Sequence, residues 1–556
     1  MVLIVVYWLF LFFFILPFGI LVKKGLKLKT INATIVVLLG LFLLTISFTV
    51  TAFFIPLNKY NFLACFSVCL FLYAIYWQPV KNLLQLFSKE IRNLTLFNKI
   101  IITAVALGAA LKSAQLPFVI DNESYYIQTI KWVNEYGLVK GLANLHLFLA
   151  QASPWHIVHA GLNLNFTGIT FNDINGFVIV LCILFSIQQT GKDKNKNHWL
   201  SLMPVFIPLF FLFADAPSPD LPLLVITPLL LYFYVHDESE DNFTLSFLLF
   251  LFIAFVKITI VPLGLIFLPR LFKNKSILQF TFLALLVAAL WIIKNSIVSG
   301  YPLYPLTLLP LPADWTLPKP VLDTVNSVAY NYVYGTDSNA SFFTKITSWL
   351  QLPGVKGLFN KLIIILFVLM PFFRKVRQDK NYRTAYIAFL IHFIILLFTS
   401  PQYRFFLPEI IFFVLLISGE ILNLFNKAVL QKSVIAGGVL AGLLLLFSFN
   451  FKAATKNKFH QNSLGFQLSQ VYKPEPVTRY EDMGFVKRKT GNLEYYSPET
   501  NFFLYGTADG PLPCVNKAQI DFIKQKTGYT PQIRQHNTTG NPTISEGFVS
   551  VKNLRE

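Results

Sequence analysis

The chain contains a long series of apolar segments, each close to the length that crosses a lipid bilayer. Crossing about 30 Å of hydrocarbon takes roughly 20 helical residues, and the backbone there must satisfy its own hydrogen bonds. Hydrophobic residues make up 55% of the chain and charged residues only 13%, against about 25% charged in soluble domains. The sequence therefore predicts an all-α polytopic membrane protein, built as a helical bundle.

We expect about fourteen membrane spans. They run from Val2 to Val22, Thr30 to Phe54, Tyr60 to Gln78, Lys99 to Pro117, Asp173 to Thr190, Trp199 to Ala214, Asp220 to His236, Phe243 to Val256, Ile258 to Arg270, Ser276 to Ser296, Phe359 to Phe373, Thr384 to Ser400, Phe405 to Asn423 and Ser433 to Asn450. The first lacks a basic start and a cleavage pattern, which favours a retained span over a signal peptide.

Lysine and arginine gather in alternate connections between the spans. Such enrichment marks the cytoplasmic face, so the connections with few basic residues, including loops 118–172 and 297–358, are expected outside the cytoplasm with both termini. Dividing the run from Phe243 to Arg270 at Lys257 keeps this pattern; one long helix with a snorkelling lysine is the alternative. We expect a multi-pass protein of a bacterial inner (plasma) membrane.

The net charge of +19 would suggest a nucleic-acid partner in a soluble protein. Here the basic residues lie between apolar runs, where they set topology, so we expect membrane lipids as partners and no nucleic acid. The four cysteines show no spacing typical of disulfide frameworks or zinc sites.

Composition changes after residue 450. Residues 1–450 form the predicted transmembrane domain, and residues 451–556 a small extracytoplasmic C-terminal domain, for which an α+β fold is one option. The second large loop is rich in proline, which opposes regular helix, so we expect an extended chain that covers the first loop.

Polar residues are concentrated between Pro117 and Phe166. Asp121 opens a segment with helical periodicity that stops at Gly137, so we expect an amphipathic helix on the outer membrane surface. A purely structural interpretation is that Asp121 caps this helix and Glu123 favours its positive end. Trp132 and Trp155 are expected as anchors at the membrane interface.

His146, His156 and His159 lie in the same loop. His156 and His159 are three residues apart and can share a helix face, with Asp121 or Glu123 completing a metal site. The alternative is that these histidines hydrogen-bond a substrate or the loop itself.

More charged residues are predicted at the same outer boundary. Asp220 begins a span, where capping is again the simpler role; the others are Asp215, Lys257, Lys294 and Arg404. Charges of both signs at a membrane boundary need a partner, and a lipid that bears phosphate would be one.

The stretch from about Lys99 to Tyr304 resembles the GT-C multi-pass glycosyltransferases, the class of protein mannosyltransferases and aminoarabinose transferases. The matching features are Asp121 with Tyr125, the helix that stops at Gly137, Pro219 with Asp220, and Lys257 between two short helices. The chain departs from the family in two ways: Asn122 stands in place of the second acid, with Glu123 one position later, and three spans precede the span that leads into the motif, where the family usually has one. The loop is also similar to an uncharacterised family of bacterial membrane proteins that share its YGLVKGLANLH and WH patterns.

The GT-C resemblance implies an inverting transferase that moves a sugar from a polyprenyl-phosphate donor to an acceptor on the extracytoplasmic face. Asp121 would be the general base, while Glu123 and Asp220 would orient the acceptor or hold a divalent metal. Lys257, Lys294 and Arg404 would stabilise the leaving phosphate, so no cofactor is needed if these cations suffice. His146, His156 and Tyr125 would contact substrate.

Two other functions fit the sequence. One is a transporter or flippase for a lipid-linked saccharide, which would require discontinuous helices and a site near the bilayer midplane. The other is a non-catalytic membrane scaffold.

Overall fold

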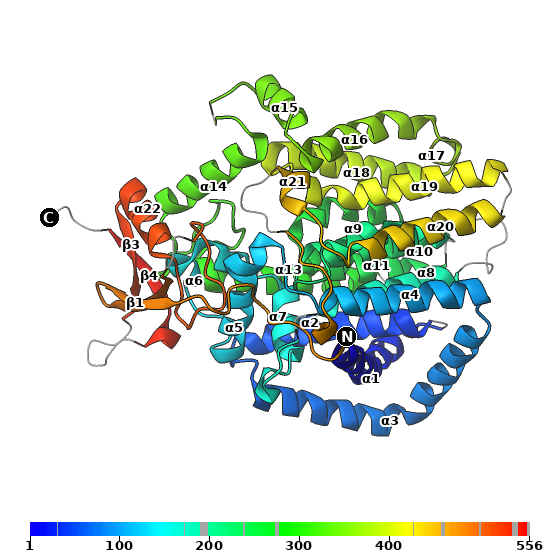
Figure 1. Ribbon diagram of the computed structural model, residues 1–556, viewed down its shortest axis with the longest axis horizontal. Coiled ribbons are helices and arrows are strands. Elements are labelled where there is room, and N and C mark those ends of the chain that lie inside the picture. Colours follow the sequence, from blue (N-terminus) through cyan, green and yellow to red (C-terminus); the bar gives the residue numbers. More distant parts are fainter. Residues whose placement is uncertain are drawn as a thin grey trace.

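The computed structural model describes residues 1–29, 32–171, 173–189, 198–236, 239–272, 277–337, 339–425, 428–456, 462–499, 502–535 and 543–552. It is mostly helical: long helices form one body, and the few strands lie together at one end (Figure 1). The fold class is therefore helical, with a small β element confined to the C-terminal region.

Seven segments within the described ranges are long and apolar enough to cross a membrane. They are α1 (Val2–Gly25), α2 (Ala33–Ala52), α3 (Lys59–Arg92), α4 (Leu96–Ser113), α13 (Ile277–Ser299), Val355–Phe372 formed by α16 (Val355–Leu369) and η6 (Met370–Phe372), and α18 (Lys380–Thr399). Several helices of membrane-crossing length are thus present, and the total of fourteen spans stays a prediction.

The other predicted spans also fall on helical elements, most of them shorter. These are α8 (Ile174–Gln188), η4 (His198–Phe206) with α9 (Ile207–Phe211), α10 (Asp220–His236), α11 (Glu240–Val256), η5 (Ile258–Phe267) with α12 (Leu268–Leu271), α19 (Leu407–Phe425) and α20 (Ala428–Leu444). Pro204 and Pro262 lie inside the 3₁₀ segments, where proline's missing N–H is consistent with the departure from α-helix. The predicted ends at Thr30, Thr190 and Ser276, and the basic connection from Lys192 to Lys196, lie outside the described residues.

The chain leaves the helix at Lys257, where the sequence prediction divides the run. Lys257 has an extended backbone, with φ −149° and ψ 113°, between α11 and η5. A lysine is costly inside hydrocarbon, and this break turns it toward charged partners described below.

Residues 118–172, which we call the first outer loop after the side on which it is expected, form a chain of short helices: η1 (Asn122–Tyr126), α5 (Ile127–Glu135), α6 (Leu142–Leu145), η2 (Leu147–Gln151), α7 (Pro154–Leu162) and η3 (Asn165–Thr167). The expected helix after Asp121 is present as η1 and α5, and it ends before Gly137, whose φ is +75°. Its location differs from the expectation. Trp132 and Trp155 are fully buried in protein, so the prediction of interfacial tryptophans is wrong: other segments of the chain cover this helix.

The second outer loop, residues 297–358, contains two helices, α14 (Lys319–Tyr334) and α15 (Phe342–Leu350), and the stretch from the end of α13 to Lys319 is irregular chain with turns. The proline-rich stretch that suggested an extended loop leads up to α14, and its last proline, Pro320, fits in the first turn of that helix. The loop packs on the first one, as expected of a cover: Gly141 N donates to Ile297 O at 2.8 Å, and Tyr304 Oη donates to Leu147 O at 3.0 Å.

Two short elements complete the helical body, α17 (Arg374–Gln378) before α18 and η7 (Tyr403–Phe405) before α19. The C-terminal region then contains α21 (Phe451–Thr455), η8 (Leu468–Val471), β1 (Phe485–Thr490), β2 (Leu493–Pro498), α22 (Lys517–Thr527), β3 (Tyr529–Ile533), η9 (Ile544–Glu546) and β4 (Phe548–Lys552). Strands β1 and β2 pair antiparallel, and so do β3 and β4.

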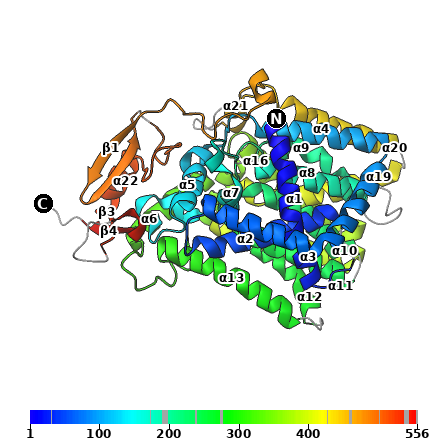
Figure 2. The same ribbon diagram turned by 90° about the horizontal axis from the view of Figure 1, so that it is seen from below.

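The four strands and α22 lie against the first outer loop, at the same end of the bundle as α5 and α6 (Figures 1 and 2). Phe548 N at the start of β4 donates to Lys140 O at 2.9 Å, and Arg534 Nε donates to Asp314 Oδ2 at 2.6 Å. Residues from three distant parts of the chain therefore build this end of the molecule.

Candidate active site

Asp121 meets Arg404 at the start of the first outer loop. Arg404 Nη1 donates to Asp121 Oδ2 at 2.6 Å and lies 3.5 Å from Asp220 Oδ2. Arg404 Nε donates to Gln402 Oε1 at 2.9 Å, which fixes the plane of the guanidinium. One arginine thus bridges two carboxylates that come from different segments of the chain.

Lys257 completes the group by forming an ion pair with Asp220. Its Nζ also lies 4.1 Å from the centre of the Phe405 ring, a distance at which a cation is attracted to the ring face. Asp220 lies in the first turn of α10, and Lys257 lies at the break after α11. We call Asp121, Asp220, Lys257 and Arg404 the charged cluster.

The charged cluster is partly open to solvent. The side chains of Asp121 and Arg404 are 22% and 27% exposed, that of Lys257 is 17% exposed, and that of Asp220 is only 2% exposed. The side chain of Asp121 makes no capping hydrogen bond to its own helix, so the capping interpretation does not describe this residue. A molecule in solvent therefore has more access to Asp121 and Arg404 than to Asp220.

Aromatic rings and one histidine line the inner side of the charged cluster. The ring centres of Tyr126 and His156 are 4.7 Å apart, and those of Tyr125 and His156 are 5.9 Å apart. Burial raises the pKa of both tyrosines well above its usual range, and the negative charge of Asp121 raises the pKa further. Burial lowers the pKa of His156 to about 3, with the charge of Lys294 adding to the effect, so the imidazole is neutral near pH 7.

Lys294 lies close enough to His156 for its charge to act on the imidazole, and it is not a member of the charged cluster. Its Nζ is buried and donates to Ala152 O at 2.7 Å. Lys294 has no carboxylate at ion-pair distance among the residues that the structure describes. It therefore contributes a positive charge close to His156, but no direct contact with Asp121.

Glu123 points away from the charged cluster and into the C-terminal region. Its carboxylate accepts hydrogen bonds from Thr478 Oγ1 at 2.6 Å and from Arg479 N at 3.2 Å, while its carbonyl accepts from Thr507 N and Ala508 N, each at 2.9 Å. Burial raises the pKa of Glu123, and the hydrogen bonds oppose that rise. In this arrangement Glu123 fastens the C-terminal region to the outer loop.

His146 has a similar fastening contact. Its Nε2 lies 3.1 Å from Tyr505 O, and its Nδ1 accepts a hydrogen bond from Phe148 N at 3.2 Å. Burial lowers the pKa of His146 to about 4. Of the candidate residues, the structure therefore brings together Asp121, Asp220, Lys257 and Arg404, with Tyr125 and His156 beside them, and places Glu123, His146 and Lys294 elsewhere.

Two residues of the site were missed by the sequence reasoning. Gln402 orients Arg404, and Phe405 lies against Lys257. A signal was present in the sequence: Gln402 to Phe406 reads QYRFF, an arginine surrounded by aromatic residues immediately before an apolar helix.

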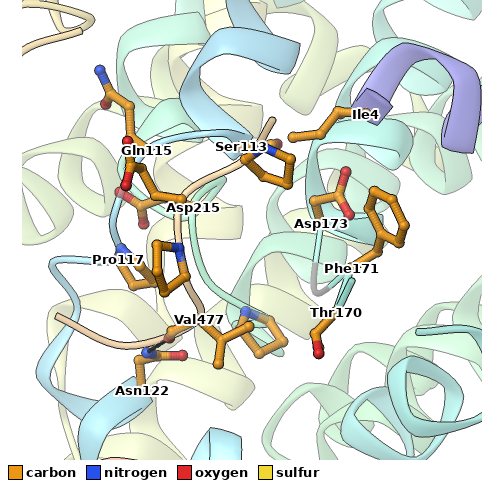
Figure 3. Close-up of a pocket in the computed structure, with 14 residues that line it drawn as sticks. Ile4, Ser113, Gln115, Pro117, Asn122, Thr170, Phe171, Asp173, Asp215 and Val477 are labelled. Carbon is orange, nitrogen blue, oxygen red and sulfur yellow. Dashed lines mark hydrogen bonds between the residues drawn. The ribbon is translucent and has the colours of Figure 1, made fainter. Parts of the chain in front are cut away.

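Asp215 belongs to a separate ion pair. Its Oδ2 lies 2.8 Å from Lys112 Nζ, and both side chains are buried. Asp215 lines a small pocket of about 20 Å³ together with Asp173 and residues 474–477 (Figure 3), enough room for one ordered water. Asp173 and Asp215 lie on opposite sides of it (Figure 3). No residue of the charged cluster is among the residues that line the pocket, so the two are distinct.

The described residues contain no group of three or more His, Cys, Asp or Glu side chains placed to hold a metal ion. In particular, Glu123 and Asp220 face different partners. The charged cluster consequently offers two carboxylates and two cations that neutralise one another, an arrangement suited to proton transfer and to binding an anion.

One comparison with known proteins gives a match. A family model described as a domain of unknown function (DUF8201) matches residues 1–411, a range that contains the whole charged cluster and ends before the C-terminal region. No curated protein and no solved structure matches the chain.

Proposed function

The chain belongs to the family described as a domain of unknown function (DUF8201), and we propose that it is a membrane glycosyltransferase. It transfers a sugar from a polyprenyl-phosphate donor to an acceptor on the extracytoplasmic face. The observation that carries the proposal is the pairing of Asp121 with Arg404, because it joins a partly exposed carboxylate to a cation suited to phosphate.

Asp121 acts as the general base in this proposal. A carboxylate within about 3 Å of an acceptor hydroxyl removes its proton as the oxygen attacks the anomeric carbon. The bond from that carbon to the phosphate oxygen breaks, and the polyprenyl phosphate leaves with the electron pair. The partial exposure of Asp121, and the absence of a capping bond to its own helix, support this role.

Arg404 and Lys257 stabilise the leaving phosphate. Arginine binds phosphate through two parallel N–H donors, and Arg404 Nη2 makes no hydrogen bond among the described residues. Preorganised cations at a developing negative charge are a major source of rate enhancement. Asp220 holds both cations in place, and Tyr125 and His156 form the wall against which the sugar binds.

The remaining candidate residues have different roles in this scheme. Glu123 and His146 hold the C-terminal region against the outer loop, and burial together with the positive charge of Lys294 keeps His156 neutral. No cofactor is required by this mechanism, since Arg404 and Lys257 supply the positive charge. The resemblance to GT-C enzymes at Asp121, Tyr125, Asp220 and Lys257 supports the proposal.

The location we propose is the inner membrane of a bacterium, with both termini outside the cytoplasm. The helices of membrane-crossing length and the uneven distribution of Lys and Arg among the loops support it. The charged cluster would then face the side on which a lipid-linked donor presents its sugar.

A transporter of lipid-linked saccharides is the second candidate, and one observation favours it. His392 on α18 and Glu409 on α19 form a fully buried pair inside the helical body. Ionisable residues within membrane helices often lie on a transport path, and the helix break at Lys257 is of the kind found at transporter sites.

A turnover assay separates these functions. The purified full-length chain, reconstituted in lipid nanodiscs without any gradient, is mixed with a polyprenyl-phosphate-linked sugar and candidate acceptors. Release of free polyprenyl phosphate with sugar on the acceptor supports the transferase. Movement of intact donor across the membrane of proteoliposomes, without release of polyprenyl phosphate, supports the transporter. If neither release nor movement is seen, the non-catalytic scaffold is the remaining function.

A further inference from the structure

Part of the second outer loop is attached to the segment that carries Arg404. Residues 330–334 at the end of α14 and residues 342–359 of α15 and α16, which we call the platform, lie beside α18 at one edge of the bundle (Figure 1). Trp349 Nε1 donates to Pro401 O at 2.7 Å, and the Tyr334 hydroxyl donates to Leu397 O. The platform and residues 397–405 therefore form one packed unit.

The platform carries two lysines that lie over tyrosine rings. Lys345 Nζ is 5.0 Å from the ring centre of Tyr330, and Lys356 Nζ is 4.4 Å from that of Tyr332. Lys356 Nζ also donates to the Tyr332 hydroxyl at 3.1 Å, and it has no carboxylate at ion-pair distance among the described residues. Because its partner is neutral, Lys356 keeps its full positive charge available to an anion.

Aromatic contacts continue from Lys356 to the charged cluster. The ring of Phe359 stacks on Tyr403 with centres 5.5 Å apart and planes at 6°, and Tyr403 precedes Arg404. Burial raises the pKa of Tyr403 to about 12; Arg404 opposes this rise, while Asp220, Asp121 and Tyr332 add to it. Lys356 and Phe359 are one turn apart on α16, so the contact of Phe359 with Tyr403 links the lysine to the residue before Arg404.

The other edge of the platform continues into a surface suited to lipid. Phe342 of α15 stacks on Phe398 of α18 at 5.3 Å, and Phe343 and Phe398 are 78% and 66% exposed. Because α18 is long and apolar enough to cross a membrane, lipid chains would cover Phe398. An amphipathic helix with aromatic and lysine residues at this depth lies in the head-group layer.

We propose that the platform binds the phosphate head group of a polyprenyl-phosphate lipid and delivers it to Arg404. Lys345 and Lys356 attract the phosphate, the exposed phenylalanines contact the first part of the lipid chain, and Tyr403 leads to the charged cluster. Delivery to Arg404 rests on the function proposed above, whereas binding at the platform is a separate property that needs no turnover.

The test measures binding of labelled polyprenyl phosphate, without sugar, to the full-length chain in zwitterionic nanodiscs. The variants are Lys356→Gln and the double change Lys345→Gln with Lys356→Gln. The control is Lys319→Gln, which removes the same charge at the other end of α14, about 20 Å from Tyr332 by helix rise. Thermal unfolding of each variant is recorded to verify that the fold is kept.

A lysine near a membrane surface contributes about 1 kcal/mol to binding an anionic lipid, which is about fivefold in Kd. We expect a Kd about fivefold higher for Lys356→Gln, about 30-fold higher for the double variant, and unchanged for Lys319→Gln. An unchanged Kd in the double variant would overturn the proposal, and so would an equal loss in the control. Displacement of the lipid by inorganic phosphate at equal concentration would also overturn it, because the lipid chain would then contribute nothing.

The outcome separates this inference from the proposed function. If the double variant loses lipid binding while the unmodified chain transfers no sugar, lipid binding at the platform is supported and the transferase proposal is contradicted. If the unmodified chain transfers sugar and the double variant has an unchanged KM for the donor, the transferase proposal is supported and lipid binding at the platform is contradicted.

Discussion

Arg404 Nη1 lies 2.6 Å from Asp121 Oδ2, although the two residues are 283 positions apart in the chain. In the proposed reaction this contact holds the base in place and leaves it paired with the group that later binds phosphate. Arrival of the donor phosphate at Arg404 would loosen the pair, because two anions then compete for one guanidinium. Substrate binding would thereby make Asp121 available to the acceptor.

Asp121→Asn is expected to abolish sugar transfer while leaving the fold intact. The amide has nearly the same shape, but it does not take a proton from the acceptor, and loss of a general base costs about 10²- to 10⁴-fold in rate. The measurement is the initial rate of polyprenyl phosphate release. Asp521→Asn, the same change at an exposed residue of α22, is the control and should keep full activity. Full activity in Asp121→Asn would end the assignment of the base.

Arg404→Lys should retain only part of the activity. Lysine keeps the positive charge but loses the planar fork that reaches Asp121, Asp220 and a phosphate together. Charge-assisted hydrogen bonds contribute about 1.5–3 kcal/mol each, so we expect a loss of about 10- to 150-fold in kcat/KM. Arg404→Gln should lower kcat/KM further than Arg404→Lys does, because glutamine carries no positive charge. Equal activity in all three proteins would mean that Arg404 does not contact the reacting phosphate.

The C-terminal region should respond to pH through two residues with opposite effects. Burial raises the pKa of Glu123 above its ordinary value of 4.5. The stability that Glu123 gives to the contact between the C-terminal region and the first outer loop is therefore present at low pH and is lost as the pH rises through the raised pKa. The pKa of His146 falls from 6.5 to about 4. Its contribution is present above pH 6.5 and is lost as the pH falls toward about 4.

Two variants separate these contributions. In His146→Gln, the amides of Thr507 and Ala508 should become better protected from hydrogen exchange as the pH falls through the raised pKa of Glu123, because Glu123 then titrates without the opposing effect of His146. In Glu123→Gln the same amides should become less protected. Exchange rates are corrected for their intrinsic pH dependence. If both variants show the same slope, these two side chains do not control docking.

The His392–Glu409 pair should contribute to stability as a unit. Replacing either residue by leucine leaves a buried polar partner unsatisfied, which costs about 1–3 kcal/mol. Replacing both by leucine should cost less than the sum of the single changes, since apolar residues can fill a buried pair's site. Thermal unfolding of the four proteins in one detergent gives the comparison. Additive losses would show that the two residues do not depend on each other.

Much of the helical fold could be predicted because each apolar run carries its own signal. Every predicted span has a helical counterpart, and the break at Lys257 was predictable because a lysine in the middle of a span is costly. Helix α5 was predictable from its periodicity and from Gly137. The helices α14 and α15 were missed, since the prolines before Lys319 dominated the interpretation of that loop.

The partners of single side chains were less predictable. Asp121 and Glu123 are two residues apart and chemically alike, yet one faces Arg404 and the other faces Thr478, which lies 355 positions later. The π-helical turn of η1 and the contacts with the C-terminal region decide this difference. Contacts between residues so distant in sequence are set by tertiary packing and leave no local pattern.

The attachment of the C-terminal region also sets the order in which parts of the site form during synthesis. Glu123 meets Thr478 across 355 residues, and at about 5–20 residues per second the ribosome needs roughly 20–70 s to make that length of chain. During this interval the outer loop exists without the residues that fasten it. The start of the loop, with Asp121 two residues from Glu123, therefore reaches its final hydrogen bonding only after Thr478 has been made, so a chain truncated before Thr478 would contain every residue of the charged cluster and still lack the side-chain contacts that hold Glu123.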